Sequence, residues 1–397
     1  MTSKGKNIMS MSQIEQQPHG ALPKPTHDEL ARQQFVRTFK EHIVSDVFPG
    51  NRIAYDRRAK PAFEKEHGAE PKDMRDVAKV MHDDPHFRMF SALLRTSQEM
   101  MWSSAQLPVQ RTLPELVKTA ASIEAPLGTL TLDPSVALPG YHNAVDIHCQ
   151  PGGYHTEYMA DDVAQGAIYD RAVYLYAMGQ LGRDNADMGD SLVYWLKSNS
   201  PDMSPLRILD MGCSVGHSTL PYTDAWPDAE VHAIDVAAPM LRYAHARAEA
   251  KGARVHFSQQ NAEKTNFEDG SFDIVVSHIL LHETSEKAIH NIIAECQRLL
   301  KPGGIMLHVE TPPYEGMEPF EVFLYDWDTA NNNEPFWRRS HQIDLKNLNA
   351  KAGFDPENTI TEMVPSAYQM AAAERTNTFQ GGDFGGGGVW FIYGCHK

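Results

Sequence analysis

The chain has 397 residues, 42% of them hydrophobic, so it can bury a full core and has room for two domains. Its 52 acidic side chains outnumber the 36 basic ones, and the formal net charge of -16 argues against the basic surface that nucleic-acid binding requires. The four cysteines form no CxxC pair, no apolar signal core follows the first lysines, and no apolar run reaches the roughly 18 to 20 residues of a membrane helix. We therefore expect a cytoplasmic protein with reduced thiols and no membrane partner.

The N-terminal third is predicted to be mainly helical. Residues 1–24 are rich in Gln, Ser, Lys and Pro and predict a disordered tail, and residues 25–160 form the expected helical domain. A capping box at Thr26 opens an amphipathic helix that should end at Pro49. Further helices are expected at 74–81, 86–101 and 113–121, followed by loops with room for a hairpin at 126–154.

Histidines gather in the stretch YHNAVDIHCQPGGYH at 141–155, which contains His142, His148, Cys149 and His155. Their spacing matches no standard zinc pattern, so we assign no metal ligand. A Pro-Gly-Gly turn among polar and aromatic groups instead favours a substrate-binding loop. We assign His155 and the nearby Tyr158 to acceptor binding.

Residues 161–397 have the texture of an α/β domain. After a helix at 161–179, apolar runs of about five residues alternate with helix-length segments, which is typical of βαβ units and a parallel sheet. Helices are expected at 239–251, 286–300 and 345–352. Strands are expected at 207–211, 230–235, 254–258, 272–277, 305–309, 359–364 and 389–394.

The turn after the first of these strands, in RILDMGCSVGHSTL at 207–220, indicates a bound ligand. Its small residues Gly212, Ser214 and Gly216 let backbone amides approach a ligand closely. A carboxylate at Asp210 would repel a pyrophosphate, and the GxGxxG pattern is missing. The turn therefore favours a ligand that is positively charged at this end.

Two later strand ends indicate the rest of the ligand. Asp235 ends the second strand, where a carboxylate can accept hydrogen bonds from both ribose hydroxyls. The QNAE stretch at 260–263 follows the third strand and offers a side-chain amide to an adenine edge. A cationic adenosine, S-adenosylmethionine, fits all three features.

These stretches resemble the class I S-adenosylmethionine-dependent methyltransferases, most closely the ubiquinone-biosynthesis-type branch. The matching pieces are LDMGCSVGHST, AIDVAAPML, QNAEKTNFEDGSFDIVVSHILLHE, AECQRLLKPGGIMLHVE and LKNLNAKAGF, between residue 206 and the C-terminus. The chain departs from the family at Ser214, where Gly is usual, and at Asn261, where Asp is usual. The resemblance implies a Rossmann-like seven-stranded α/β sheet with an antiparallel last strand, and methyl transfer to a small-molecule acceptor.

The resemblance and the strand-end positions together give the predicted site. His278 and His282 follow the fourth strand, where the resemblance places the methyl-transfer cleft. Each can serve as a base for a hydroxyl acceptor, and a structural role in the turn stays open. If helix follows the strand directly, the two rings share a face. The predicted cofactor contacts are Asp210, Gly212, Ser214, Gly216, Asp235, Val236, Asn261, Ala262, Ser277, Tyr169 and Arg171.

The long connection at 311–340 mixes aromatic residues with acids and asparagines. Because it is too long for an idle loop, it predicts a lid over the acceptor, with a helical packing insert as the alternative. From it we assign Tyr325, Trp327, Asn332 and Trp337 to acceptor binding. The glycine-rich stretch 381–388 predicts a hairpin loop before the last strand.

Three other functions stay open at this point. The same cofactor can support a non-methylating reaction such as cyclisation. An NAD-dependent oxidoreductase uses a similar sheet but is disfavoured by Asp210, and a metal-binding module would use the histidines at 141–155. The sequence does not choose the acceptor atom or the oligomeric state, for which a homodimer is one option.

Overall fold

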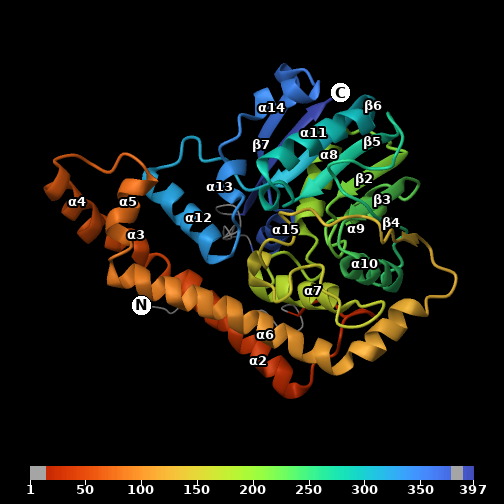
Figure 1. The fold of residues 1–397 in the computed structure, drawn as a ribbon, viewed down its shortest axis with the longest axis horizontal. Coiled ribbons are helices and arrows are strands. Elements are labelled where there is room, and N and C mark those ends of the chain that lie inside the picture. Colours follow the sequence, from red (N-terminus) through yellow and green to blue (C-terminus); the bar gives the residue numbers. More distant parts are fainter. Residues whose placement is uncertain (1–14, 377–387) are drawn as a thin grey trace.

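The computed structural model describes residues 15–376 and 388–397 (Figure 1). Residues 1–14 of the predicted tail and 381–387 of the predicted glycine-rich loop lie outside the described residues. The centre of the molecule is an eight-stranded sheet in the order β1-β4-β3-β2-β5-β6-β8-β7. Its strands are β1 Thr129–Thr131, β2 Arg207–Met211, β3 Glu230–Asp235, β4 His256–Gln259, β5 Phe272–His278, β6 Leu300–Glu310, β7 Thr359–Pro365 and β8 Val389–His396.

The predicted α/β sheet with an antiparallel last strand is confirmed, with one strand more than expected. β8 pairs antiparallel with both β6 and β7, and the other neighbouring strands are parallel. The additional strand, β1, comes from the N-terminal third and pairs with β4. Gly128 permits this, since a Cβ there would lie 2.0 Å from the Val255 carbonyl oxygen. The hairpin predicted between residues 126 and 154 is therefore wrong.

Helices cover both faces of the sheet (Figure 1). α10 (Ala238–Ala250) packs against α7 (Ala164–Tyr176) on one side, and α11 (Glu286–Leu299) packs against α14 (Leu345–Ala352) on the other. The central strands are accordingly buried on successive residues, as at Ile208, Leu209, Val275 and Val276. The remaining helices of this part are α8 (Asp187–Asn199), α9 (Leu220–Ala225), α12 (Pro319–Asn331), α13 (Trp337–Ser340) and α15 (Ala367–Thr376).

The N-terminal helices run beneath the sheet and then extend away from it as an arm (Figure 1). α2 (His27–His42) starts with the predicted capping box between Thr26 and Glu29. Helical structure does not end at Pro49, where the sequence predicted the end of this helix. It continues through π-helical turns at Ile43–Val47 and Tyr55–Ala59, around α3 (Gly50–Ala54), into α4 (Lys60–His67) and α5 (Met74–Met81). Proline at the N-cap of α3 costs little, because its missing N–H would have no helical partner there.

The two helices predicted at 86–101 and 113–121 are one 37-residue helix, α6 (Pro85–Ala121). Pro108 and Pro114 lie inside it. Burial of Trp102, Ala105 and Val109 in one core with α7 residues keeps the chain helical through prolines that would end an isolated helix.

Residues 15–24 are packed and not disordered, which corrects the second half of the predicted tail. Gln16 Nε2 donates to Asp170 Oδ1 at 2.7 Å, and His19 Nε2 lies 2.9 Å from Asp170 Oδ2. The composition of this segment predicts disorder because it has few apolar residues. Composition cannot show that its polar side chains, Gln16 and His19, contact the buried Asp170.

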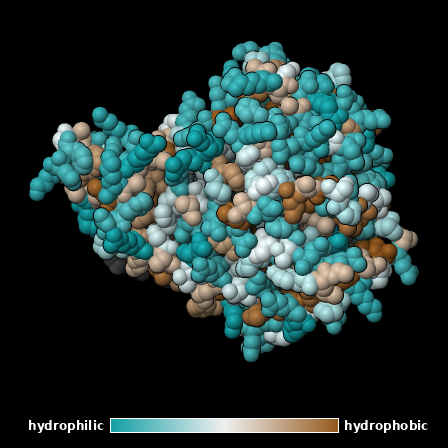
Figure 2. Space-filling model, in the orientation of Figure 1, coloured by the Kyte–Doolittle hydropathy of each residue, from teal (hydrophilic) through white to brown (hydrophobic). Residues whose placement is uncertain are grey.

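The face of the molecule seen in Figure 2 is mostly hydrophilic, with apolar residues in small separate patches. Among residues 15–376 and 388–397, no helix combines the length and the apolar content needed to cross a membrane.

Candidate functional site

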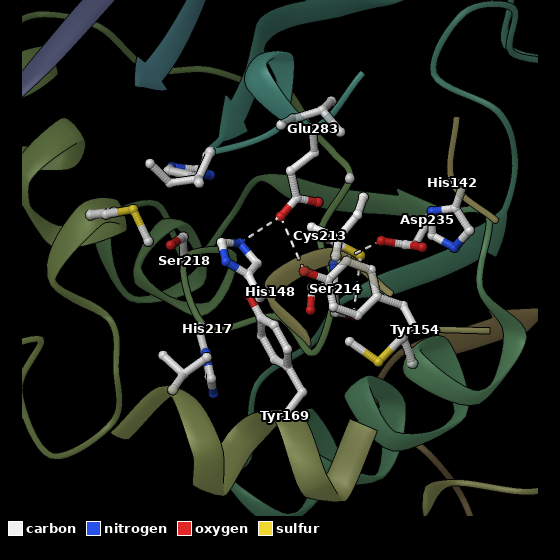
Figure 3. A pocket seen from close by; sticks show the side chains of 18 of the residues that line it. His142, His148, Tyr154, Tyr169, Cys213, Ser214, His217, Ser218, Asp235 and Glu283 are labelled. Carbon is white, nitrogen blue, oxygen red and sulfur yellow. Dashed lines mark hydrogen bonds and ion pairs between the residues drawn. The ribbon is translucent and has the colours of Figure 1, made fainter. Parts of the chain in front are cut away.

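A cavity lies at the carboxyl ends of β2, β3, β4 and β5, between the sheet and the helices beneath it (Figure 3). The sheet side contributes residues from the turns after these strands. The opposite side is formed by α6, the loop at 141–154 and α7. The predicted residues that line the cavity are Tyr169, Asp210, Gly212, Ser214, Asp235, Val236, Asn261, Ala262 and His278.

The turn after β2 is shaped by three left-handed residues. Gly212, Ser214 and Gly216 have φ values of 70°, 50° and 75°. Glycine is favoured at 212 because its φ strains other residues, and a Cβ there would lie 2.6 Å from Leu280 Cδ1, so that side chain would have to move. Gly216 packs towards Leu220 and does not line the cavity, so it shapes the turn without contacting a ligand.

Asp235 joins the turn to the end of β3. One oxygen accepts the Ser214 N–H at 3.0 Å, and the other accepts the Ala237 N–H at 2.9 Å. Burial raises the pKa of this carboxyl to about 6. Each carboxylate oxygen has a second lone pair, so Asp235 can still accept two hydrogen bonds from a ligand.

Asp210 has protein partners that the sequence does not indicate, so it is less available to a ligand. Its oxygens accept from Thr219 Oγ1 at 2.5 Å and lie 3.3 Å from His278 Nδ1. It nevertheless lines the cavity with Asp235 and Glu283, and none of the described lining residues is Lys or Arg. The cavity therefore suits a ligand that is neutral or positively charged.

The far end of the cavity offers polar atoms without a protein partner. Asn261 Oδ1 accepts the Glu263 N–H at 2.9 Å, which turns its amide nitrogen to other acceptors. His142 Nε2 is buried with no hydrogen-bond partner, and burial lowers the pKa of this imidazole to about 4, so the ring is neutral. Unsatisfied buried groups are costly, so these atoms indicate a polar ligand.

Comparison with known proteins agrees with this geometry. Residues 208–304 match the family model described as a methyltransferase domain. The chain is 35% identical over 112 residues to the demethylmenaquinone methyltransferase of Thermus thermophilus, covering 28% of this chain and 50% of that protein. It is 32% identical over 119 residues to the malonyl-[acyl-carrier protein] O-methyltransferase of Methylococcus capsulatus, covering 30% and 41%.

This chain contains a methyltransferase domain at residues 208–304. It spans about half the length of the curated relatives it matches. A solved structure that resembles it is the magnesium protoporphyrin IX methyltransferase of Synechocystis with bound S-adenosylhomocysteine, at 18% identity and a TM-score of 0.38, covering 56% of this chain and 87% of that one.

Besides Gly216, two more predicted cofactor contacts, Arg171 and Ser277, do not line the cavity. Arg171 donates to Gln33 Oε1 at 2.8 Å, on the side of α7 opposite to Tyr169. Residues two apart on a helix point about 200° apart, so Tyr169 and Arg171 cannot both face one ligand. Ser277 is fully buried and lies 2.7 Å from His308 Nδ1.

The two predicted bases are separated by the backbone. His278 lines the cavity, with Nε2 3.1 Å from the Tyr222 hydroxyl. His282 does not line it, and its Nδ1 lies 2.6 Å from Glu310 Oε2. Ile279 has a φ of 58°, so helix does not follow β5 directly and the predicted shared face is wrong.

We expect His282→Gln to lower thermal stability and to leave cofactor affinity unchanged. Burial alone would lower the pKa of His282, but Glu310 and Glu334 outweigh it and raise it. A raised histidine pKa stabilises the fold fully below about pH 6.5, and this contribution is lost as the pH rises through the folded-state value. Melting curves should therefore show a larger loss in the mutant at acidic than at alkaline pH. A uniform loss at all pH values would contradict the ion pair.

The predicted acceptor residues lie outside the cavity lining. Tyr158 is 56% exposed on the surface. His155 packs against His142, with ring centroids 5.5 Å apart, and does not itself line the cavity. Trp337 packs on His282 with ring centroids 4.7 Å apart. Asn332 reaches only the second layer, where its Nδ2 donates to the Tyr176 hydroxyl at 3.2 Å.

The predicted lid is also placed elsewhere, which favours the packing-insert alternative. α12 carries Tyr325 and Trp327 and packs against the N-terminal arm. Trp327 lies 5.2 Å from Phe87 and 5.1 Å from Phe90 between ring centroids. Trp327 therefore fills a core together with Phe320 and Phe323 of the same helix.

Trp327→Ala should accordingly destabilise the protein by about 2 to 3 kcal/mol, somewhat below the cost for a fully buried Trp. The acceptor KM should change little. Chemical unfolding and steady-state kinetics test this, with the exposed aromatic substitution Tyr194→Ala as control. Unchanged stability with a raised acceptor KM would instead support the prediction that this segment is a lid over the acceptor.

Sequence reasoning missed several residues that line the cavity. His142 and His148 belong to the predicted substrate-binding loop, but the sequence does not single them out, and Glu283 directly follows His282. Across the described part of the chain, no group of three or more His, Cys, Asp or Glu side chains is arranged to hold a metal ion.

Proposed function

We propose that the protein transfers a methyl group from S-adenosylmethionine to a small-molecule acceptor bound in this cavity. The observation that carries the proposal is the position of Asp235, half-buried at the end of β3 beside the turn at 212–216. It supports ribose binding, while Asn261 and His142 offer donors and acceptors for an adenine. Asp210 suits the positively charged end of the cofactor.

The shape of the cavity supports a small acceptor. α6, the loop at 141–154 and α7 cover the strand ends, and Trp102, Tyr154, Tyr169 and Tyr176 line that cover. Such a lining excludes water and orients an acceptor, and it leaves little room for a macromolecule. We divide the chain accordingly into a cap at 25–160 and a methyltransferase domain at 161–397. The cytoplasmic location and a homodimer stay predictions.

The bound cofactor supplies an already activated methyl group on its sulfonium. The protein has to hold the acceptor atom in line with that group and keep water out, and proximity and orientation can provide most of the rate enhancement. The described residues that can do this are the rings of the cap and the polar groups at the end of β5.

Calorimetry of the wild-type protein with S-adenosylhomocysteine and with NADH tests the proposal. We expect S-adenosylhomocysteine to bind in the micromolar range and NADH to show no binding, because a pyrophosphate would meet Asp210 in the turn. Binding of NADH in the absence of S-adenosylhomocysteine binding would instead support the oxidoreductase alternative.

A further inference from the structure

Glu283 is held in a fixed position inside the cavity by two donors. It lies in the 3-10 helix Leu281–Glu283 that follows β5. Its Oε1 lies 3.0 Å from His148 Nε2 and accepts from the Tyr154 hydroxyl at 3.1 Å. Figure 3 shows the carboxylate pointing into the cavity between these two side chains.

His148 is itself held tightly. Its other ring nitrogen, Nδ1, lies 3.2 Å from Glu334 Oε1. Its backbone carbonyl accepts from Gln98 at 2.9 Å and from the Trp102 indole at 2.7 Å. His148 has a φ of 54°, a conformation that non-glycine residues adopt only where the surroundings impose it.

The charges of this cluster follow from its contacts. Burial alone would lower the pKa of His148, but Glu334 and Glu283 outweigh it and raise it to about 10, so the ring is an imidazolium at neutral pH. Burial alone would raise the pKa of Glu283, but His148 lowers it, so the carboxyl is ionised. At the cavity surface the two side chains form a pair without net charge.

The second oxygen of Glu283, Oε2, accepts no hydrogen bond from the described residues, although the side chain lines the cavity and is 18% exposed. An ionised oxygen in a pocket of aromatic rings is a strong acceptor that lacks a donor. A neutral hydroxyl can supply that donor without the cost of moving a further charged group from water into the pocket.

We propose that Glu283 Oε2 binds the methyl acceptor by accepting a hydrogen bond from its hydroxyl group, and that the cavity selects uncharged, largely apolar hydroxyl compounds. This inference rests on the proposed methyl transfer. His148, Tyr154 and Glu334 act through Glu283 as positioning residues. Anionic acceptors are disfavoured because Asp210, Asp235 and Glu283 line the cavity and no described lining residue is Lys or Arg.

The proton balance is consistent with a carboxyl of low pKa. As the new O–C bond forms and the S–C bond breaks, the hydroxyl oxygen becomes positively charged and its proton becomes far more acidic than a carboxylic acid. The proton passes to Glu283 Oε2 and from there to water when the products leave. A weak base is sufficient, because the proton moves only once the oxygen is being methylated.

Ligand-observed NMR on the complex with S-adenosylhomocysteine tests the proposal. The probes are aromatic fragments of matched size that carry a hydroxyl, a carboxylate or an ammonium group. We expect wild type to bind hydroxyl fragments more tightly than ammonium fragments and to reject carboxylates. Glu283→Gln should weaken hydroxyl binding at least about tenfold, as expected for a hydrogen bond to a charged group.

Two control variants separate this effect from misfolding. Glu230→Gln changes a 56% exposed acid at the opposite end of β3 and should bind every probe as wild type does. Glu283→Asp keeps the charge but withdraws the oxygen, so it should bind hydroxyl fragments weakly and still reject carboxylates. Both Glu283 variants should bind S-adenosylhomocysteine within about twofold of wild type.

Four results would overturn the proposal: no hydroxyl fragment binds wild type, carboxylates bind equally well, ammonium fragments bind best, or Glu283→Gln leaves hydroxyl binding unchanged. Failure of wild type to bind S-adenosylhomocysteine is a different outcome, because it would overturn the proposed function itself.

Discussion

Asp235→Ala is expected to weaken S-adenosylhomocysteine binding at least about 100-fold, because two ribose hydroxyls lose a charged acceptor worth about 1.5 to 3 kcal/mol for each hydrogen bond. The substitution also removes the acceptor of the hydrogen bonds that the Ser214 and Ala237 N–H groups donate in the wild type. Calorimetry measures the affinity. The control is Glu230→Ala, at the other end of the same strand, which should bind normally.

The same carboxyl predicts a pH dependence. Burial raises its pKa to about 6, and only the ionised form accepts from both hydroxyls. Affinity should therefore fall as the pH is lowered through about 6, and Asp235→Ala should remove that dependence. Equal affinity in mutant and wild type would contradict the assignment of this residue to the ribose.

Asp170→Asn is expected to lower the free energy of unfolding by about 3 to 5 kcal/mol, the usual cost of leaving a buried charge without its partner. Asp170 is fully buried, and its oxygens lie 2.7 Å from His217 Nε2 and 3.5 Å from Arg247 Nε. It also accepts from the Tyr243 hydroxyl at 2.8 Å and from Gln16. Asparagine removes the charge and points N–H donors at these donors.

Chemical denaturation measures this loss, with Asp269→Asn as the control. Asp269 is 81% exposed and pairs with Arg298, and exposed ion pairs contribute little to stability. Because His217 belongs to the turn after β2 and lines the cavity, Asp170→Asn should also weaken S-adenosylhomocysteine binding. A mutant as stable as Asp269→Asn would contradict the role of Asp170 in joining residues 15–24, α7, α10 and the turn.

The α/β half of the fold could be predicted because its signals are local. Strands such as β2, β5 and β8 contain short apolar runs, and the turn residues Gly212 and Asp235 stand at strand ends that a parallel sheet brings together. β1 was missed because three residues, Thr129–Thr131, carry too little apolar pattern to indicate a strand.

The wrong predictions for the site share one cause, because the positions of these residues depend on contacts between segments that are far apart in the sequence. The aromatic residues of α12 are equally suited to a lid and to a core, and only the position of Phe87 and Phe90 decides between them. Likewise, side-chain chemistry alone favours His282 as a base and gives no reason to single out Glu283. The left-handed residue Ile279 and the partner His148, 135 positions away, decide which of the two faces the cavity.

The central claim is methyl transfer to a small molecule, and its most direct test is incubation of the protein with cell extract and methyl-labelled S-adenosylmethionine, followed by untargeted mass spectrometry. Our account predicts a small product that carries the labelled methyl group, formed by wild type and lost in Asp235→Ala. Release of labelled methylthioadenosine with no methylated product would contradict it and would assign the cavity to a non-methylating reaction of the same cofactor.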